Sequence, residues 1–456
     1  MPGSSRSANR KPKGIAIRPE AVRQARIEKG LSLAEVAGRE ITRAAVHLVE
    51  AGKMRPSMRT LQLIAQRTGR PVSFFIAGAE GSAEHRAARD ELSHLVDTGA
   101  FDEAIAHGMQ LLREELEPGI EADVRFSVGR AHVRRIESEL ALPHLARARE
   151  LYARLGDAWM AVHVQEQEAV AMFLVEDPRT MSRTLDALER CDRLDPPAPA
   201  LRASILNVLA NIHMRERDWA NAARFFEMGL EACDGLVSMR QAARLHDGLS
   251  MARQQLGDFG GALRSAERAF ALYSVDTDTM ALVRAENNLG YVLLRQGELN
   301  AAAPHLLRAL DLCDRHGLQR FCRAHVLNSL GELHLERGQP DQAQVHLRRA
   351  LEVATELNEG DAEATARHLL GRVHLRLGDE AAADRSFRAA IELLKRLDLT
   401  ERLRQCAAEY ADLLHRQGRL EESIACWRIA AGAAGMVAPS RTRTNGRVAS
   451  RGSTGA

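Results

Sequence analysis

The fold is decided by residues 287–310, which read NNLGYVLLRQGELNAAAPHLLRAL. Two similar stretches follow, LNSLGELHLERGQPDQAQVHLRRAL at 327–351 and LLGRVHLRLGDEAAADRSFRAAI at 369–391. Each places a glycine between two amphipathic runs, where a left-handed turn ending a helix costs glycine least. Five such glycines recur at intervals of 40 or 41 residues: Gly257, Gly297, Gly338, Gly378 and Gly418. This pattern predicts helical hairpins repeated along the chain.

Small residues accompany these glycines at fixed distances. Five positions after each glycine stand Ala262, Ala302, Ala343, Ala383 and Ser423. Seven positions before each stand Ser250, Gly290, Gly331, Gly371 and Ala411. Small side chains at matching places on two helices predict that the helices of one hairpin approach each other closely.

The L-G, G, A and A spacing of these stretches resembles the tetratricopeptide repeat. A period of 40 exceeds the usual ~34 and implies longer helices. Weaker copies have Gly99, Ile136, Asp177 and Arg217 near the glycine position, which gives about nine hairpins between residues 90 and 436. The resemblance implies an all-α fold with a right-handed α-solenoid and a concave groove. The segment DPPAPA at 195–200 predicts a longer loop between repeats or a break in curvature.

The resemblance also implies that the first helix of each hairpin lines the groove. One column of that face reads Asn207, Asp247, Asn287, Asn328 and His368, and one turn later come Asn211, Met251, Tyr291, Glu332 and Arg372. Asparagine both donates and accepts hydrogen bonds, so the column suits the backbone of an extended peptide. Arg244 and Arg284 lie three positions upstream and suit a carboxylate. The alternative is that these polar residues only hydrate an exposed groove.

The segment before the repeats predicts a compact domain of five short helices at residues 17–78. Its first helix begins at Pro19 and stops at Gly30, and Ser32 and Thr42 are candidate N-caps of a second helix, ending near Arg39, and a third. A fourth helix, capped by Ser57, stops at Gly69, and the apolar run FFI at 74–76 closes the domain. Two short helices joined by a tight turn indicate a helix-turn-helix.

Three stretches carry a second resemblance: LSLAEVA at 31–37, ITRAAVHLVEAGK at 41–53 and RPSMRTLQLIAQRTGRPVSFFI at 55–76. They resemble the phage-repressor-like (XRE-type) helix-turn-helix family, whose third helix lies in the major groove of DNA. Carried over by position, seven residues are expected to face double-stranded DNA: Thr42, Arg43, Ala44, His47, Leu48, Lys53 and Arg55.

Other positions of this family match structural roles. Arg26 and Glu50 occupy positions that form an ion pair between the first and third helices, and Val46 and Val49 are expected to pack inward. The chain departs from the family in a turn before Ile41 that is one residue shorter, and in Leu33, where a polar residue often contacts phosphate.

Charge is divided unevenly along the chain. Residues 1–78 hold 15 Lys and Arg but 5 Asp and Glu, whereas the remainder holds 48 basic and 56 acidic residues. A basic head on an acidic body suits a phosphate-binding module joined to a body that does not bind nucleic acid. Residues 1–16 are predicted to form a disordered basic arm, 79–89 a linker and 437–456 a disordered tail.

Several classes of protein and site are disfavoured. No apolar run is long enough to span a bilayer and no secretory h-region follows the basic start, so a cytoplasmic location is expected. The six cysteines form no C-x-x-C pair and read as small buried apolar residues. No metal-ligand spacing, phosphate-binding glycine loop or nucleophile elbow is present, so neither cofactor nor enzymatic activity is expected.

Two functions fit these observations. In the first, the chain is a transcription regulator, a homodimer on a two-fold DNA site, whose repeats sense a peptide or protein ligand. In the second, it is an adaptor whose repeats recruit a protein while the head only localises it or makes protein contacts. An enzyme acting on nucleic acid would be a third class, but it lacks a catalytic constellation.

Overall fold

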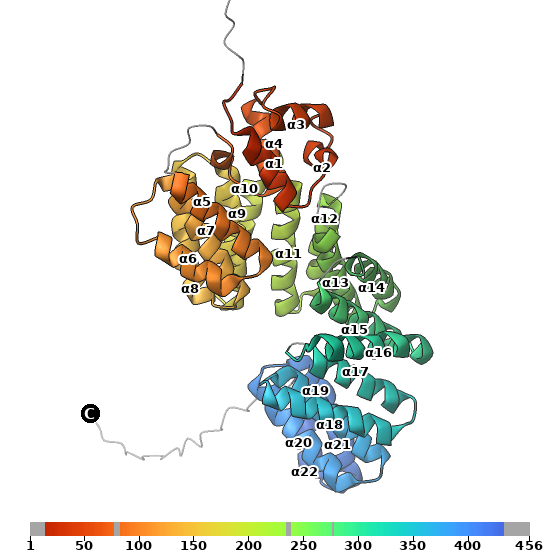
Figure 1. The fold of residues 1–456 in the computed structure, drawn as a ribbon. Coiled ribbons are helices and arrows are strands. Elements are labelled where there is room, and N and C mark those ends of the chain that lie inside the picture. Colours follow the sequence, from red (N-terminus) through yellow and green to blue (C-terminus); the bar gives the residue numbers. More distant parts are fainter. Residues whose placement is uncertain (1–13, 77–82, 234–238, 276–277, 321, 433–456) are drawn as a thin grey trace, which may run out of the picture. The chain divides into compact units, whose positions relative to one another are not determined.

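The computed structural model describes residues 14–76, 83–233, 239–275, 278–320 and 322–432 (Figure 1). Within these ranges the chain forms twenty-two α-helices and one 3-10 helix, and extended backbone pairs only in an isolated bridge between Ile17 and Ile76. The all-α prediction is confirmed. None of the described helices is long and apolar enough to cross a membrane. Contacts divide the chain into two compact units, Met1–Thr277 and Asp278–Ala456.

The first unit begins with the predicted head. Its helices are α1 (Pro19–Glu28), α2 (Leu33–Ala37), α3 (Arg43–Glu50), α4 (Met58–Thr68) and the 3-10 helix η1 (Val72–Phe74). The hydroxyls of Ser32, Thr42 and Ser57 each accept a hydrogen bond from a backbone N–H of the first turn that follows, so all three predicted N-caps are confirmed. Helix α2 stops at Ala37, not near Arg39, because Gly38 turns the chain with φ 55°.

Helical hairpins form the rest of both units. The first unit contains α5 (Ala83–Thr98), α6 (Phe101–Leu111), α7 (Pro118–Arg134), α8 (Ser138–Arg154), α9 (Ala158–Leu174), α10 (Thr180–Asp192), α11 (Pro199–Glu216), α12 (Trp219–Ala232), α13 (Met239–Gln255) and α14 (Phe259–Tyr273). The second contains α15 (Thr279–Arg295), α16 (Leu299–His316), α17 (Arg323–Glu336), α18 (Pro340–Glu356), α19 (Gly360–Arg376), α20 (Glu380–Arg396), α21 (Thr400–Arg416) and α22 (Leu420–Ala430).

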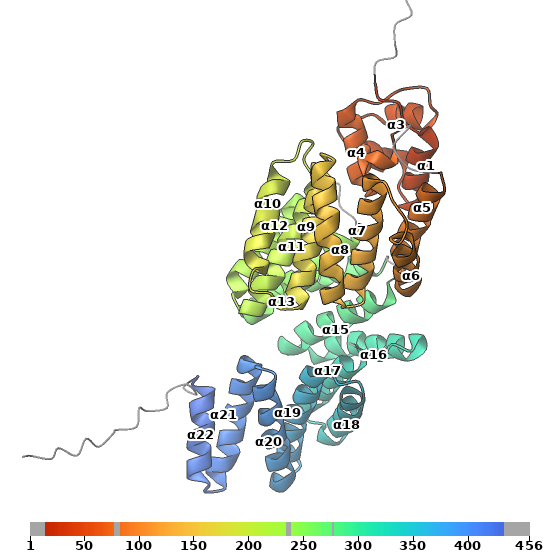
Figure 2. The same ribbon diagram turned by 90° about the vertical axis from the view of Figure 1, so that its left-hand side faces the viewer.

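Consecutive helices in these ranges pair, which gives nine hairpins in the described parts of the chain, as predicted (Figures 1 and 2). Helix α5 already begins at Ala83, inside the segment 79–89 predicted as a linker. The predicted arm lies mostly, and the predicted tail entirely, outside the described residues.

Left-handed residues close the hairpins where the repeat pattern places them. The five glycines from Gly257 to Gly418 all have positive φ, between 71° and 83°. Among the weaker copies, Gly99, Ile136 and Arg217 also have positive φ, as the extended frame predicts. Near Asp177 the left-handed residue is its neighbour Glu176, with φ 55°. Asp177 instead accepts hydrogen bonds from the backbone and side chain of Arg179.

The helices within a hairpin approach closely at the small residues. A Cβ added to Gly331 would lie 2.4 Å from Cγ of Leu347, and one added to Gly290 would lie 2.7 Å from Cγ of Leu306. Where serine replaces glycine or alanine, its hydroxyl bonds across the hairpin: Ser250 Oγ donates to the carbonyl of Ala262 at 2.9 Å. The predicted close approach is therefore present in both units.

The head packs on the first hairpins of its own unit. Arg70 is buried and contacts Ser93 of α5, and the guanidinium of Arg89 lies 4.8 Å from the ring centroid of Phe74. The loop 195–200, predicted only as a break between repeats, contacts α4 through Asp195 and Pro196. This loop has a role in tertiary structure that its composition did not reveal.

We expect Gly331→Ala to lower the free energy of unfolding by about 1–3 kcal/mol, because the new methyl group overlaps a buried leucine that has no free space. Urea unfolding followed by circular dichroism measures this. Gly260→Ala is the matched control: it is also helical, but its nearest neighbour for a new Cβ is Nη1 of Arg264 at 3.7 Å. Equal stabilities of the two variants would contradict the close approach.

Candidate nucleic-acid interface and ligand sites

The third helix of the head has one buried and one exposed face. Val46 and Val49 are buried in the core of the head, as predicted. The hydroxyl of Thr42 accepts a hydrogen bond from the N–H of Ala45 at 3.1 Å and so begins the helix. The opposite face is left to solvent.

All seven residues predicted to face DNA are exposed: Thr42, Arg43, Ala44, His47, Leu48, Lys53 and Arg55. Among the described residues, no hydrogen bond or ion pair joins α3 to a repeat helix. Figures 1 and 2 both show α3 at the end of the head away from α9 and α10. The face is therefore open in the same arrangement in which the head packs on the repeats.

A two-point ion pair fixes α3 on α1. Nε of Arg26 donates to Oε1 of Glu50 at 2.7 Å and Nη2 donates to Oε2 at 3.1 Å. The hydrogen bond with Glu50 raises the pKa of the Arg26 guanidinium above its ordinary value. The predicted pair is confirmed, and its side chains are largely buried.

A second arginine closes the short turn between α2 and α3. Nη1 of Arg67, on α4, donates to the carbonyls of Val36 and Ala37, both at 2.6 Å. A side chain at Gly38 would collide with this guanidinium, since its Cβ would lie 2.5 Å from Nη2. Sequence reasoning missed Arg67, although a basic side chain beside a helix C-terminus is a known way to satisfy the last carbonyls.

In the first unit, four predicted groove residues lie on two helices. Asn207 and Asn211 are half-buried on α11, where Nδ2 of Asn211 donates to the carbonyl of Asn207 at 2.8 Å. Arg244 is exposed on α13, and Asp247 is half-buried one turn later.

The second unit holds the other seven, and their surroundings differ. Arg284 is exposed, and the hydroxyl of Tyr291 accepts a hydrogen bond from Arg295 at 3.3 Å. Asn287 has a buried Oδ1 without a hydrogen-bond partner in the described structure. Asn328 is buried, and its Nδ2 donates to the carbonyl of Ala362 in the next hairpin at 2.9 Å. Its amide group is thus already used to join two repeats.

The remaining three lie at or beside a polar cavity of about 370 Å³ in the second unit. Arg372 lies in the cavity wall, with Nη2 2.8 Å from a carboxylate oxygen of Glu336 and Nη1 3.7 Å from one of Glu332. Nε2 of His368 lies 3.0 Å from a carboxylate oxygen of Glu409, which also lines the cavity. Arg295 and Gln405 complete the polar wall.

Burial and charge act differently on two carboxyls of this cavity. Burial raises the pKa of Glu332, against the opposing effect of Arg372 and Arg295. Burial also opposes ionisation of Glu409, but the hydrogen bond with His368 and the charge of Arg372 lower its pKa below the ordinary value. Sequence reasoning missed Glu336 and Glu409. Glu336 lies four residues after Glu332 and was open to the same helical spacing argument.

Metal and thiol chemistry find no support in the described ranges. No group of three or more His, Cys, Asp or Glu side chains there is placed to hold a metal ion. The six cysteines are unpaired, five of them are buried, and burial raises the pKa of Cys191 and Cys313 to about 12. Thiols held neutral in this way are poor nucleophiles.

Comparison with known families agrees with the structure of both the head and the repeats. Residues 22–75 match the helix-turn-helix family model, and residues 281–356 and 322–396 match the tetratricopeptide repeat model. The chain combines a helix-turn-helix domain with tetratricopeptide repeats. Both resemblances drawn from the sequence are thus confirmed. Comparison with curated proteins gives no match.

Solved structures share this repeat fold at low sequence identity. They include the apo form of the quorum sensor NprR from B. thuringiensis, at 13% identity and TM-score 0.59, covering 76% of this chain and 98% of that one. A Rap protein complexed with Competence and Sporulation Factor has 13% identity and TM-score 0.55 and covers 77% and 98%. Aspartyl phosphate phosphatase F from Bacillus subtilis has 11% identity and TM-score 0.52 and covers 79% and 97%. At such identities the likeness concerns the fold.

We expect Arg26→Met to destabilise the helix-turn-helix domain by about 3 kcal/mol, because it leaves the buried carboxylate of Glu50 without its partner. Hydrogen exchange of the α1 and α3 amides in the whole chain measures this. Arg23→Met, an exposed position on the same helix, should leave exchange unchanged. Equal exchange rates in both variants would show that the ion pair does not hold α3 in place.

Proposed function

We propose that the protein is a sequence-specific DNA-binding transcription regulator whose repeats sense a peptide or protein ligand. The observation that carries this proposal is the exposure of all seven predicted DNA-facing residues on one part of the helix-turn-helix domain, which also carries the excess of basic charge. Protein–DNA binding depends on such charge because phosphate contacts release counterions. We propose no catalytic activity for the chain.

Each exposed residue has a role that its chemistry suits. The guanidinium of Arg43, in the first turn of α3, can donate twice to guanine, and Ala44 or Leu48 can touch a thymine methyl group. Lys53 and Arg55 neutralise phosphates and set the register of the domain on the duplex. His47 reaches a phosphate, and Thr42 lies beside it at the start of the helix. Because one such domain reads few base pairs, a cytoplasmic homodimer on a two-fold site is proposed.

For the ligand, we propose a peptide or protein segment bound along the first helices of the hairpins. The cavity of the second unit presents three carboxylates, from Glu332, Glu336 and Glu409, against the guanidiniums of Arg295 and Arg372. This excess of negative charge suits an amino group or a basic side chain. Asn287, whose buried Oδ1 has no hydrogen-bond partner in the described structure, is proposed as a polar contact with the ligand.

The other predicted contacts extend the same proposal. The exposed guanidiniums of Arg244, in the first unit, and Arg284, in the second, each suit a carboxylate of the ligand. We propose six further polar contacts with the ligand: Asn207, Asn211, Asp247, Tyr291, Asn328 and His368. The fold is shared with a structure described as a quorum sensor, which is consistent with a sensing role. To act as a signal, the ligand must bind one arrangement of the protein more tightly than another.

We expect Arg43→Ala to weaken binding to the protein's own operator by about 1–3 kcal/mol, since one bidentate base contact is lost. A mobility-shift assay on the promoter upstream of its own gene, at several salt concentrations, measures this. Arg224→Ala, an exposed arginine on α12, is the charge-matched control and should bind as the unaltered protein does.

Two outcomes of that assay would count against a regulator. Unaltered protein that showed no sequence preference, or whose binding did not fall with salt, would leave the adaptor function, in which the head only localises the repeats. Equal DNA affinity of the two variants would instead show that Arg43 does not contact the bases, although DNA would remain a partner.

We expect Arg372→Ala to reduce the amount of peptide or protein that co-purifies with the chain. The reason is that Arg372 holds the carboxylate of Glu336 in position in the cavity wall. Quantitative mass spectrometry of material purified from cells measures this. Arg376→Ala, exposed one turn further along α19, is the control. An identical set of co-purified molecules in both variants would exclude this cavity as the ligand site.

A further inference from the structure

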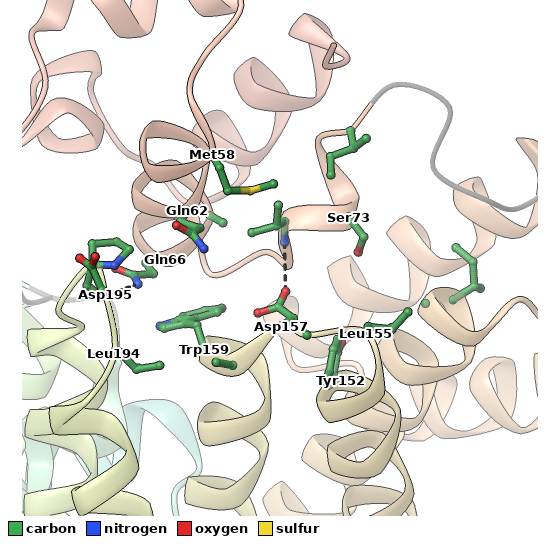
Figure 3. Close-up of a pocket in the computed structure, with 18 of the residues that line it drawn as sticks. Met58, Gln62, Gln66, Ser73, Tyr152, Leu155, Asp157, Trp159, Leu194 and Asp195 are labelled. Carbon is green, nitrogen blue, oxygen red and sulfur yellow. Dashed lines mark hydrogen bonds between the residues drawn. The ribbon is translucent and has the colours of Figure 1, made fainter. Parts of the chain in front are cut away.

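A second cavity, of about 530 Å³, lies inside the first unit between the helix-turn-helix domain and the repeats (Figure 3). One wall comes from α4 and η1. The other comes from α5, the start of α7, the turn between α8 and α9 and the loop before α11. Cavities of ~300–1,000 Å³ are the usual size of small-molecule sites. None of the proposed DNA-facing or groove residues lines it.

Three polar contacts hold the walls together around this space. Nη1 of Arg59 lies 2.6 Å from Oδ1 of Asp195, and Nε2 of Gln66 donates to the carbonyl of Pro196 at 3.1 Å. On the other side, the N–H of Val72 points to Oδ2 of Asp157 at 3.4 Å, which a dashed line marks in Figure 3. The walls are therefore joined at their edges while the space between them is left open.

Apolar side chains face this space without being covered. Met58 of α4 is 48% exposed and Leu155 is 49% exposed, although both line the cavity. Trp159 is half-buried, and Figure 3 shows its ring below the side chains of Gln62 and Gln66. A thioether and an indole ring are favourable neighbours for an aromatic group.

Charged side chains also line the cavity: Arg86, Arg193 and Arg89, the last of which already pairs with Asp90 and Asp123. Two hydrogen-bond acceptors are available in the wall as well. Asp157 caps α9 by accepting the N–H of Met160 at 3.0 Å, and no cation pairs with its carboxylate among the described residues. Burial raises the pKa of this carboxyl, against the hydrogen bonds from Met160 and Val72. The amide of Gln62 faces the cavity from α4 and makes no hydrogen bond within the described ranges.

We propose that this cavity binds a small uncharged aromatic molecule carrying an O–H or N–H donor. The ring lies between Met58 and Trp159, and the donor is directed to Asp157 or Gln62, which keep free acceptor capacity. A neutral donor suits Asp157 better than a cation does, because the carboxylate caps the positive end of the α9 dipole. Since one wall belongs to α4 and the other to the repeats, an occupant stabilises the packed arrangement of the two.

The test uses 2-naphthol as probe and 2-methoxynaphthalene as its counterpart without a donor. Isothermal titration of the full chain should give saturable one-site binding of 2-naphthol and about tenfold weaker binding of the methoxy compound. Ala158→Trp, at an exposed position of the cavity wall, should abolish binding, whereas Ala153→Trp, exposed on α8 outside the cavity, should not change it. Met58→Glu, on the opposite wall, is a second blocking variant in case Ala158→Trp does not fold.

Hydrogen exchange supplies the second measurement. Bound 2-naphthol should slow exchange of α4 amides in unaltered protein and in Ala153→Trp, and should not slow it in the blocking variants. No binding to the unaltered protein would overturn the proposal, and so would full binding by a folded blocking variant. Equal affinity for the two naphthalenes would overturn the role of the donor. The result does not depend on DNA binding, so it stands or falls separately from the proposed function.

Discussion

The structure depends on how closely the two helices of each hairpin approach. A stack of hairpins has no single large core, so each one can bury apolar surface only against its immediate neighbours. At Gly290, Gly331 and Gly371 the space of a missing Cβ is filled by a leucine or phenylalanine from the partner helix. That contact sets the spacing of the pair and buries the partner side chain completely. Repeating it along the chain buries the small residues of the first helices against their partner helices.

The helix-turn-helix domain is stabilised in a different way. It is small, and two arginines add to its core by linking helices that are distant in the sequence. Arg26 joins α1 to α3, and Arg67 joins α4 to the end of α2. Both contacts act on the helices around α3, so the exposed face of that helix is fixed by contacts within the domain. A surface arranged in advance avoids part of the ordering cost of binding.

The features that sequence reasoning found depend on neighbouring residues, whereas most of those it missed are contacts between residues far apart in the sequence. Hairpin glycines, N-caps such as Ser32 and the small residue at 331 follow from rules that act within one or two turns. Arg67 reaches a carbonyl thirty-one residues away, and the loop at Asp195 meets a helix 136 residues earlier in the chain. Glu409 enters the second unit's cavity from α21, the first helix of the hairpin after the one that carries His368 on α19. These partners become visible only once it is known which faces of neighbouring helices meet. The left-handed residue at Glu176, next to Asp177, is a smaller matter of register.

The contact between the helix-turn-helix domain and the repeats is uneven in strength, and this bears on regulation. On the side of α5, Arg70 and Arg89 are buried against Phe74 and carboxylates, and such contacts are costly to break. On the side of α4, the pair of Arg59 and Asp195 is mostly exposed, with side chains 62% and 75% accessible, and exposed pairs contribute about 0–1 kcal/mol. The domain is therefore held firmly at one edge and weakly at the other. The 530 Å³ cavity reaches both edges, because Arg89 of the buried side and Asp195 of the exposed pair both line it. The proposed occupant therefore adds contacts at the weakly held edge as well as at the firm one.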